Sequence, residues 1–399
     1  MNIFIINSGS SSIKYQLFKM PSTAPVCSGL VERIGSDDVA LTHKVTANGE
    51  EIKRVFKLGK ADHEAGLNKV NELLTDPEFG VIQDRRDIQA VGHRVVHGGE
   101  RFWEPTRITG EVKQALKKLF LLAPLHNPAG YTGIEVAEKI FPDAVQIAVF
   151  DTAFHHTLPP KAFRFAIPDQ YYTGNNIRVY GFHGTSHGFI AGQAAAYLER
   201  DDLKLISIHL GNGCSITAID KGRSVDTSMG FGPLSGLIMG TRSGDIDPTV
   251  IFYMIDQLGY TPEQVNDLLN KNSGMLGLAG SNDMRDIRKA MAEGDANAKL
   301  AYEMYAYRIK KYIGAYAAAL NGVDVVAFTA GVGENDVFVR KMVCEDMEYL
   351  GISFDANKNS TRSDGIREIS TDDSRVKVLI IPTNEELEIA NQCYGLLYK

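Results

Sequence analysis

The sequence has few cysteines and no long apolar run. Its four cysteines, Cys27, Cys214, Cys344 and Cys393, lie far apart, and no two form a Cys-x-x-Cys pair. This spacing excludes a zinc-finger signature and a disulfide framework, and it favours a reduced, cytoplasmic environment. No apolar stretch approaches the ~18 residues that span a bilayer, and Ile3–Ile6 is too short for the core of a signal peptide. We therefore expect no membrane partner.

The usual nucleotide-binding motifs are also missing. No GxxxxGK[ST] segment occurs, and no GxGxxG segment opens a helix. A P-loop NTPase and a Rossmann dehydrogenase are therefore both disfavoured. The formal net charge of −7 argues against a dedicated nucleic-acid binder. The chain has 399 residues, of which 44% are hydrophobic, so two or three domains with ample cores are expected.

Two segments half a chain apart share one pattern, strand, glycine-containing turn, strand. The first is Ile3–Ile6, a polar turn at residues 7–12, and the alternating segment Ile13–Leu17. The second is Lys204–Leu210, Gly211–Gly213 and Cys214–Ile219. We interpret this as a weak internal repeat of two related halves, each opening with a hairpin that presents backbone N–H groups.

The rest of the chain alternates between strand and helix patterns. Strands are predicted over 88–96, 145–150 and 323–329, and helices over 109–122, 127–140 and 301–320. Asn127 and Pro128 are typical N-cap and N1 residues of a helix. Such alternation indicates an α/β layer architecture. Without a proline- or serine-rich linker, we place the domain boundary at tight crossings near Asp151 and Thr383.

Glycine loops and neighbouring arginines are the candidate ligand-binding features. Three loops follow predicted strands, at residues 7–12, 211–213 and 331–335, and glycine lets backbone N–H groups approach a phosphate closely. Arg94 precedes Gly98-Gly99, and Arg242 lies between Gly240 and Gly244. This pattern fits anion recognition, although ordinary turns and surface arginines remain the alternative.

Three further patterns have competing interpretations. Gly184-Thr-Ser-His-Gly188 matches the nucleophile elbow of serine hydrolases, but that family needs an acid and then a histidine later in the chain, and the only later histidine is His209, inside a glycine loop. His183 and His187 have the spacing of a zinc helix, without its glutamate; a phosphate-facing or structural role is favoured. Asp245 and Asp247 could bind Mg²⁺, but a capped turn is the better hypothesis.

Longer segments carry a family resemblance. The chain resembles the acetate kinase family of short-chain acyl kinases, in the superfamily of acetate and sugar kinases, Hsc70 and actin. The segments that carry it run from end to end in order: IINSGSSSIK (5–14), GHRVVHGGE (92–100), APLHNP (123–128), FDTAFH (150–155), YGFHGTSH (180–187), HLGNG (209–213), DTSMGFGPLSGLIMGTRSGDIDP (226–248), GVGEN (331–335) and PTNEE (382–386).

The resemblance implies an α/β fold of two duplicated actin-like, or ribonuclease H-like, domains with mixed five-stranded sheets around a central cleft. It implies an N-terminal domain at residues 1–150 plus 385–399, with the substrate and metal residues. Residues 151–384 would form the C-terminal domain, which binds nucleotide and makes a homodimer. It also implies ATP and ADP as co-substrates, with Mg²⁺, or Mn²⁺ in its place.

The resemblance further assigns roles to individual residues. The catalytic residues implied are Asp151, His183 and Arg242. The substrate-binding residues implied are Arg94, which would hold the carboxylate, and Val96, Leu125, Phe182 and Pro233, which would line an acyl pocket. The nucleotide-binding residues implied are Lys14, His209, Leu210, Gly211, Asn212, Gly213, Asp283, Met284, Arg285, Gly331, Val332, Gly333, Glu334 and Asn335. The metal-associated residues implied are Asn7 and Glu385.

The expected activity is reversible transfer of the ATP γ-phosphoryl group to acetate, giving acetyl phosphate and ADP. Val96 favours acetate over longer acids, because a propionate kinase is expected to have a smaller residue such as alanine there. A propionate or butyrate kinase of the same family remains an alternative. A nucleotide-dependent switch like actin or Hsc70 is the alternative from another class.

Overall fold

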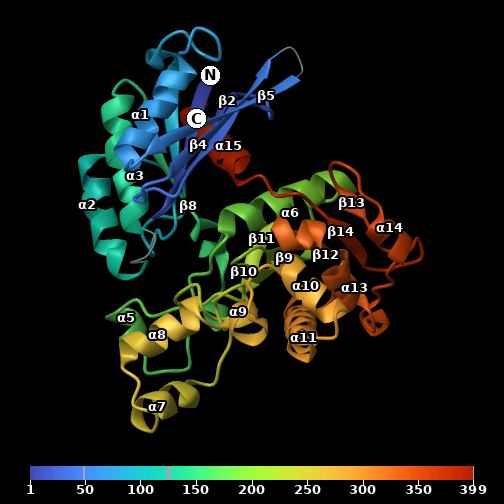
Figure 1. Ribbon diagram of the computed structural model, residues 1–399. Coiled ribbons are helices and arrows are strands. Elements are labelled where there is room, and N and C mark those ends of the chain that lie inside the picture. The colour runs from blue at the N-terminus through green and yellow to red at the C-terminus, as the bar shows by residue number, and fades with distance from the viewer. Residues whose placement is uncertain (48–49, 124–126, 399) are drawn as a thin grey trace. The chain divides into compact units, whose positions relative to one another are not determined.

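The computed structural model describes residues 1–47, 50–123 and 127–398. Chain contacts divide it into two compact units (Figure 1). Unit 1 comprises Met1–Ala153 and Asn384–Lys399, and unit 2 comprises Phe154–Thr383. Among the described residues, no helix has the length and apolarity that crossing a membrane requires.

Unit 1 is built on an eight-stranded sheet with the order β5-β4-β3-β2-β1-β6-β8-β7. Its strands are β1 (Asn2–Ser8), β2 (Ser12–Lys19), β3 (Pro25–Glu32), β4 (Val39–Ala47), β5 (Glu50–Gly59), β6 (Ile88–Val95), β7 (Thr106–Arg107) and β8 (Val145–Phe150). Its helices are α1 (His63–Leu74), α2 (Gly110–Lys118), α3 (Asn127–Ile140) and α15 (Glu385–Tyr398), with 3₁₀ turns at Arg85–Asp87 and Leu119–Leu121.

Successive side chains of β1 point to opposite faces of the sheet, and each face packs against a different layer of helices. Phe4 and Ile6 join a buried cluster with residues of α1 and α3, such as Val70 and Val136. Ile5 points to the opposite face, where α15 packs on β1 and β6. Because both faces are covered by helices (Figure 1), a short run of four apolar residues reads as a buried strand, as the sequence predicted.

Unit 2 is built on a six-stranded sheet with the order β11-β10-β9-β12-β14-β13. Its strands are β9 (Lys204–Leu210), β10 (Cys214–Asp220), β11 (Arg223–Thr227), β12 (Val325–Thr329), β13 (Arg367–Glu368) and β14 (Lys377–Ile380). Its helices are α4 (Pro160–Phe163), α5 (Gln170–Thr173), α6 (Gly184–Leu198), α7 (Pro248–Asp256), α8 (Pro262–Lys271), α9 (Gly274–Ala279), α10 (Met284–Ala292), α11 (Ala296–Leu320), α12 (Ala330–Asn335), α13 (Val337–Cys344) and α14 (Ala356–Ser360). The 3₁₀ turns are at Ala153–Thr157 and Glu348–Leu350.

The two sheets share one topology. In unit 1, β3, β2 and β1 are antiparallel neighbours, and β6 and β8 continue in parallel from β1. In unit 2, β11, β10 and β9 are antiparallel, and β12 and β14 continue in parallel from β9. The predicted α/β class with duplicated, ribonuclease H-like halves is thus confirmed. The predicted strand count of five describes only this shared core, to which unit 1 adds β4, β5 and β7 and unit 2 adds β13.

Two local predictions differ from the structure. Asn127 was predicted as a helix N-cap, but its side-chain amide instead accepts from the backbone N–H of His97 and donates to the His97 carbonyl, both at 3.1 Å. The segment 331–335 was predicted as a glycine loop, but it is part of α12, which starts directly after β12. At Asn127, hydrogen bonds to the His97 backbone override the N-cap preference, and at residues 331–335 a helix forms despite the two glycines.

Candidate active site

Arg94 and Asp151 form a buried ion pair in unit 1. Arg94 is the next-to-last residue of β6, and Asp151 directly follows the parallel strand β8. The Arg94 Nη2 atom donates to Asp151 Oδ2 at 2.8 Å, and Asp151 is only 1% exposed. The carboxyl ends of parallel strands meet at one sheet edge, which explains why residues 57 apart come together here.

The carboxylate of Glu385 interacts electrostatically with the Arg94–Asp151 ion pair. Burial alone would lower the pKa of Arg94, but Asp151 and then Glu385 outweigh it and raise that pKa above its ordinary value. Glu385 is the first residue of α15. Burial raises the pKa of Glu385 to about 6; Arg94 opposes this shift, and Asp151 adds to it. Arg94 therefore stays charged while two carboxyl groups compete for it.

Asn7 and Lys14 face each other across the β1–β2 hairpin. The register pairs their Cα atoms, and α15 packs against both strands. Lys14 Nζ makes an ion pair at 2.9 Å with the buried Glu386, so this predicted nucleotide-binding residue already has a carboxylate partner within unit 1.

The predicted metal residues, Asn7 and Glu385, supply an amide oxygen and a carboxylate from β1 and α15. The described residues contain no group of three or more His, Cys, Asp or Glu side chains that could hold a metal ion. Mg²⁺ takes oxygen ligands and usually keeps several waters, with only one or two protein carboxylates and substrate phosphates. This sparse oxygen donor set therefore fits Mg²⁺ and does not fit a preformed zinc site.

The predicted acyl-pocket residues are spread over both units. Val96 is half-buried directly after β6, whereas its neighbour Val95 belongs to a core cluster. Phe182, in unit 2, is 2% exposed and bonds His155 through its carbonyl oxygen. Pro233 is half-buried, and Leu125 lies outside the described residues.

In unit 2, three predicted residues converge on the turn between β9 and β10. The His183 ring stacks on the His209 ring, with centroids 4.2 Å apart. A Cβ atom added at Gly213 would lie 2.8 Å from Arg242 Nη2 and 3.4 Å from His183 Nε2. A guanidinium and an imidazole therefore both face the backbone of this turn, and a side chain at Gly213 would displace the Arg242 guanidinium.

The backbone and surroundings hold these side chains in place. His183 has a left-handed conformation, with φ of 54°, immediately before α6 begins. Arg242 Nη1 donates to the Pro233 carbonyl at 2.6 Å. Burial lowers the pKa of Arg242, and no carboxylate within the described ranges forms an ion pair with it. A buried guanidinium of this kind favours an anionic ligand.

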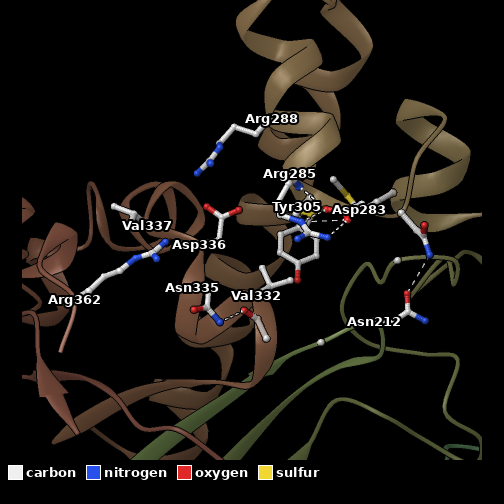
Figure 2. A pocket seen from close by; sticks show the side chains of 16 residues that line it. Asn212, Asp283, Arg285, Arg288, Tyr305, Val332, Asn335, Asp336, Val337 and Arg362 are labelled. Carbon is white, nitrogen blue, oxygen red and sulfur yellow. Dashed lines mark hydrogen bonds and ion pairs between the residues drawn. The ribbon is translucent and has the colours of Figure 1, made fainter. Parts of the chain in front are cut away.

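A cavity of about 550 Å³ opens beside this turn, entirely within unit 2 (Figure 2). Eight of the residues that line it were predicted as nucleotide-binding: Gly211, Asn212, Asp283, Met284, Arg285, Gly331, Val332 and Asn335. Six others predicted for the nucleotide do not line it: Lys14, which belongs to unit 1, and His209, Leu210, Gly213, Gly333 and Glu334. Glu334 accepts from the Thr383 N–H instead, and the Gly333 carbonyl accepts from Arg340.

Other residues of the cavity were not predicted. They include Gly240, Met275, Asn282, Arg288, Tyr305, Asp336, Val337 and Arg362. Figure 2 shows Arg288 and Arg362 extending from different elements of the cavity wall, which Asp336 also lines. Tyr305 follows the apolar face of α11, so the pattern predicts only a core residue, and it is indeed 2% exposed. For Arg362, in a loop, the sequence contains no local signal.

The three competing patterns have structural explanations. Ser186 lies within α6 and is fully buried; its hydroxyl bonds His209 Nδ1 at 2.9 Å and Thr383 at 3.0 Å, so it is not presented at a strand-to-helix elbow. His187 is fully buried and bonded to two serines. Asp247 caps α7, and Asp245 accepts from the Gly236 N–H, as the capped-turn hypothesis predicted.

Comparison with known proteins decides the family. The sequence profile of the Acetokinase family matches residues 2–391. The chain belongs to the acetokinase family. Acetate kinase of Flavobacterium johnsoniae is 56% identical over 398 residues, covering 100% of both chains. Acetate kinase of Thermotoga maritima is 51% identical over 406 residues, covering 100% of this chain and 99% of that one.

Solved structures of the acetokinase family have the same fold. A crystal structure of Porphyromonas gingivalis acetate kinase has a TM-score of 0.92 and 42% identity, covering 99% of each chain. A propionate kinase from Francisella tularensis has a TM-score of 0.91 and 40% identity, covering 98% of each chain. The resemblance seen in the sequence segments is thus confirmed along the whole chain.

Proposed function

We propose that this chain is an acetate kinase, which transfers the γ-phosphoryl group of ATP to acetate and forms acetyl phosphate and ADP reversibly. The observation that carries the proposal is the convergence of Arg242 and His183 on the Gly211–Gly213 turn, beside the 550 Å³ cavity. Family membership supports the same activity. The adenosine part of ATP occupies the cavity, and the phosphates follow the glycine turn.

A carboxylate nucleophile needs no general base, because it is almost fully ionised at pH 7. It needs an electrostatic partner, since it must approach a negatively charged phosphoryl group. Arg94 binds the acetate carboxylate, and Arg242 and His183 donate hydrogen bonds to the oxygens of the transferring group. The family resemblance assigns Val96, Leu125, Phe182 and Pro233 to binding of the acetate methyl group.

Asp151 orients Arg94 in this proposal, in agreement with their 2.8 Å hydrogen bond. A proton donor at this position is not required by an ionised substrate. Asp151→Asn should therefore lower kcat/KM uniformly across pH. A pH–rate profile that changes shape in this variant would instead support an acid–base role.

Asn7 and Glu385 would hold Mg²⁺, or Mn²⁺ as a substitute, and Lys14 would act on the nucleotide phosphates. When bound, the ion supplies positive charge that screens the phosphate oxygens. The chain's own residues position the nucleotide and the carboxylate, so most of the rate acceleration is expected from positioning and electrostatics.

Acyl phosphate formation is the direct test. The full chain is mixed with Mg-ATP and acetate, propionate or butyrate, and the product is trapped as the hydroxamate. The highest kcat/KM is expected for acetate. A higher kcat/KM for propionate or butyrate would change the proposed substrate and leave the family assignment unchanged. ATP hydrolysis without any acyl phosphate would favour the nucleotide switch, and esterase activity that is lost in Ser186→Ala would favour the hydrolase.

We also propose that the protein acts in the cytoplasm as a homodimer formed through unit 2. Helix α7 is apolar along most of its length, yet none of its residues is buried. Phe252 and Tyr253 are 63% and 57% exposed. An uncovered apolar helix favours a self-complementary interface. Light scattering should give twice 43.8 kDa for the wild type and 43.8 kDa for Phe252→Arg; a monomeric wild type would refute the proposal.

A further inference from the structure

One face of the β9–β10 hairpin carries four polar side chains. Ser207 and His209 alternate with apolar residues along β9, and Ser215 and Thr217 lie opposite them on β10. The register pairs Ser215 with His209 and Thr217 with Ser207. The three hydroxyl residues are fully buried. Because a buried hydroxyl is costly unless it is hydrogen-bonded, the partners of this face are informative.

The start of α6 supplies these partners. His183 is the N-cap residue of α6, and His187 follows four residues later in the first turns of the helix. Ser215 Oγ lies 2.9 Å from His183 Nδ1 and 2.7 Å from His187 Nε2. The second nitrogen of His187, Nδ1, lies 2.8 Å from Ser207 Oγ. A continuous chain of hydrogen bonds therefore runs from Ser207 through His187 and Ser215 to His183.

The single hydrogen of a hydroxyl gives this chain a direction. A neutral imidazole has one N–H donor and one acceptor nitrogen. If Ser207 donates to His187 Nδ1, then His187 Nε2–H donates to Ser215, and Ser215 donates to His183 Nδ1. The remaining proton of a neutral His183 must then be on Nε2. This is the nitrogen that faces the Gly213 backbone.

We propose that Ser215, supported by His187 and Ser207, is a positioning residue that keeps the donor Nε2–H of His183 directed at the Gly211–Gly213 turn. The inference rests on the proposed function, in which His183 donates to the transferring phosphoryl group. The opposite direction would place the Nε2 lone pair of a neutral His183 against phosphate oxygens, which repel it. No proton is transferred along these hydrogen bonds. They determine which nitrogen of His183 carries the hydrogen.

The consequence for catalysis is specific. Ser215, His187 and Ser207 are too deeply buried to contact a nucleotide, so loss of the hydrogen bonds among them should not weaken substrate binding. Partners that orient a metal-bound imidazole are typically worth about 10–100-fold in activity, and we expect a similar size for the imidazole of His183. Ser215→Ala should therefore lower kcat by about 10–100-fold and leave KM for ATP and acetate within about twofold.

The test combines kinetics with the tautomer of His183 in the full chain. Nitrogen-15 histidine spectra of the wild type should show His183 protonated at Nε2, with its signals assigned by their loss in His183→Gln. In Ser215→Ala, the two neutral tautomers of His183 should both be populated. Ser215→Thr, which keeps a hydroxyl on a β-strand, should restore the wild-type tautomer and most of kcat.

Thr217→Val is the matched control. It removes a buried hydroxyl from the same face of β10, where the Thr217 hydroxyl bonds that of Thr227 instead of joining the hydrogen bonds that link Ser207, His187, Ser215 and His183. This variant should keep the wild-type kcat and His183 spectrum. If Ser215→Ala does not fold, Ser207→Ala tests the same chain one hydrogen bond farther away, and it should shift the His187 and His183 signals.

Two results would overturn the inference. One is a wild-type His183 that is protonated only at Nδ1, and the other is a Ser215→Ala variant with unchanged kcat and tautomer. Failure of the proposed function is distinguishable, because it would appear as a wild type that forms no acyl phosphate. The tautomer measurement needs no substrate and stands independently of that outcome.

Discussion

Arg242 is a cation placed where an anion should bind. Its guanidinium donates a hydrogen bond to the Pro233 carbonyl and faces the glycine turn. Burial lowers the pKa of Arg242, and no carboxylate in the described part of the chain raises it. Arg242→Ala should reduce kcat by about 10³-fold or more, the size of the arginine-finger effect. Arg242→Lys should recover little, because a lysine lacks the planar fork of donors. A loss below about tenfold in the hydroxamate assay would exclude a transition-state role.

Val96 is the residue from which a substrate preference can be argued. One methylene in an apolar pocket is worth about 1–3 kcal/mol. Val96→Ala should raise the kcat/KM ratio of propionate to acetate by about tenfold, because the smaller side chain leaves room for the extra methylene. Val95→Ala is a suitable comparison, since Val95 belongs to the core cluster and should mainly affect stability. An unchanged ratio in Val96→Ala would remove the argument for acetate.

Roles of individual residues were predicted only where long segments of sequence identify the family, and these roles remain predictions; residues that act through a contact of the fold were not predicted. Arg94, His183 and Arg242 lie in such segments, and the structure gives each a partner that fits an anion site. Arg362 is isolated in a loop and joins the cavity only through the fold. Ser207 and Ser215 looked like ordinary strand residues, because their histidine partners come from another element.

At the scale of elements, the two hairpins β1–β2 and β9–β10 show what the sequence could and could not predict. Their strand, turn, strand pattern correctly indicated the duplication. Edge additions such as β7 and β13 were missed, since each has only two residues and no periodicity to detect. The Asn127 side chain was misassigned for a similar reason, because its partner is a backbone segment 30 residues away.

Asn127 joins α3 to the segment that follows β6. It is 3% exposed, and both of its hydrogen bonds go to the His97 backbone. Asn127→Ala leaves a buried N–H and C=O without this partner, so the free energy of unfolding of unit 1 should fall by about 2 kcal/mol. The exposed Thr132→Ala on the same helix should change it by less than about 0.5 kcal/mol.

Tryptophan fluorescence during urea unfolding can measure this effect selectively. The chain has one tryptophan, Trp103, and it lies in unit 1. An Asn127→Ala variant as stable as the wild type would show that water or a local shift replaces both hydrogen bonds. It would then be wrong to treat Asn127 as the connection that fixes the segment containing Val96.

At the scale of the whole molecule, the fold does not specify the acid. An acetate kinase and a propionate kinase have nearly equal TM-scores with this chain, 0.92 and 0.91. A difference of one methylene therefore has to be encoded by a few side chains on a shared scaffold. The same reasoning explains why the family could be predicted from the sequence more firmly than the substrate.

Buried neutral histidines should make the stability of unit 1 depend on pH. Burial lowers the pKa of His93 to about 4, against a hydrogen bond to Gln146 that acts in the opposite direction, and burial also lowers the pKa of His97 to about 4. The unfolded chain takes up protons at these residues near pH 6.5, while the folded chain does not. Their contribution to stability is therefore complete above pH 6.5, is lost as pH falls toward 4, and changes no further below that.

His93→Gln should flatten this dependence. At pH 5 the wild type should have lost about 2 kcal/mol at His93 alone relative to pH 7.5, by proton linkage, and the variant should not incur that loss. Urea unfolding followed by Trp103 fluorescence at the two pH values measures the difference, with the exposed His156→Gln as the control for removing a surface histidine. Equal pH dependence in wild type and His93→Gln would mean that His93 is not held neutral by burial, and the acid sensitivity would then have to come from other groups.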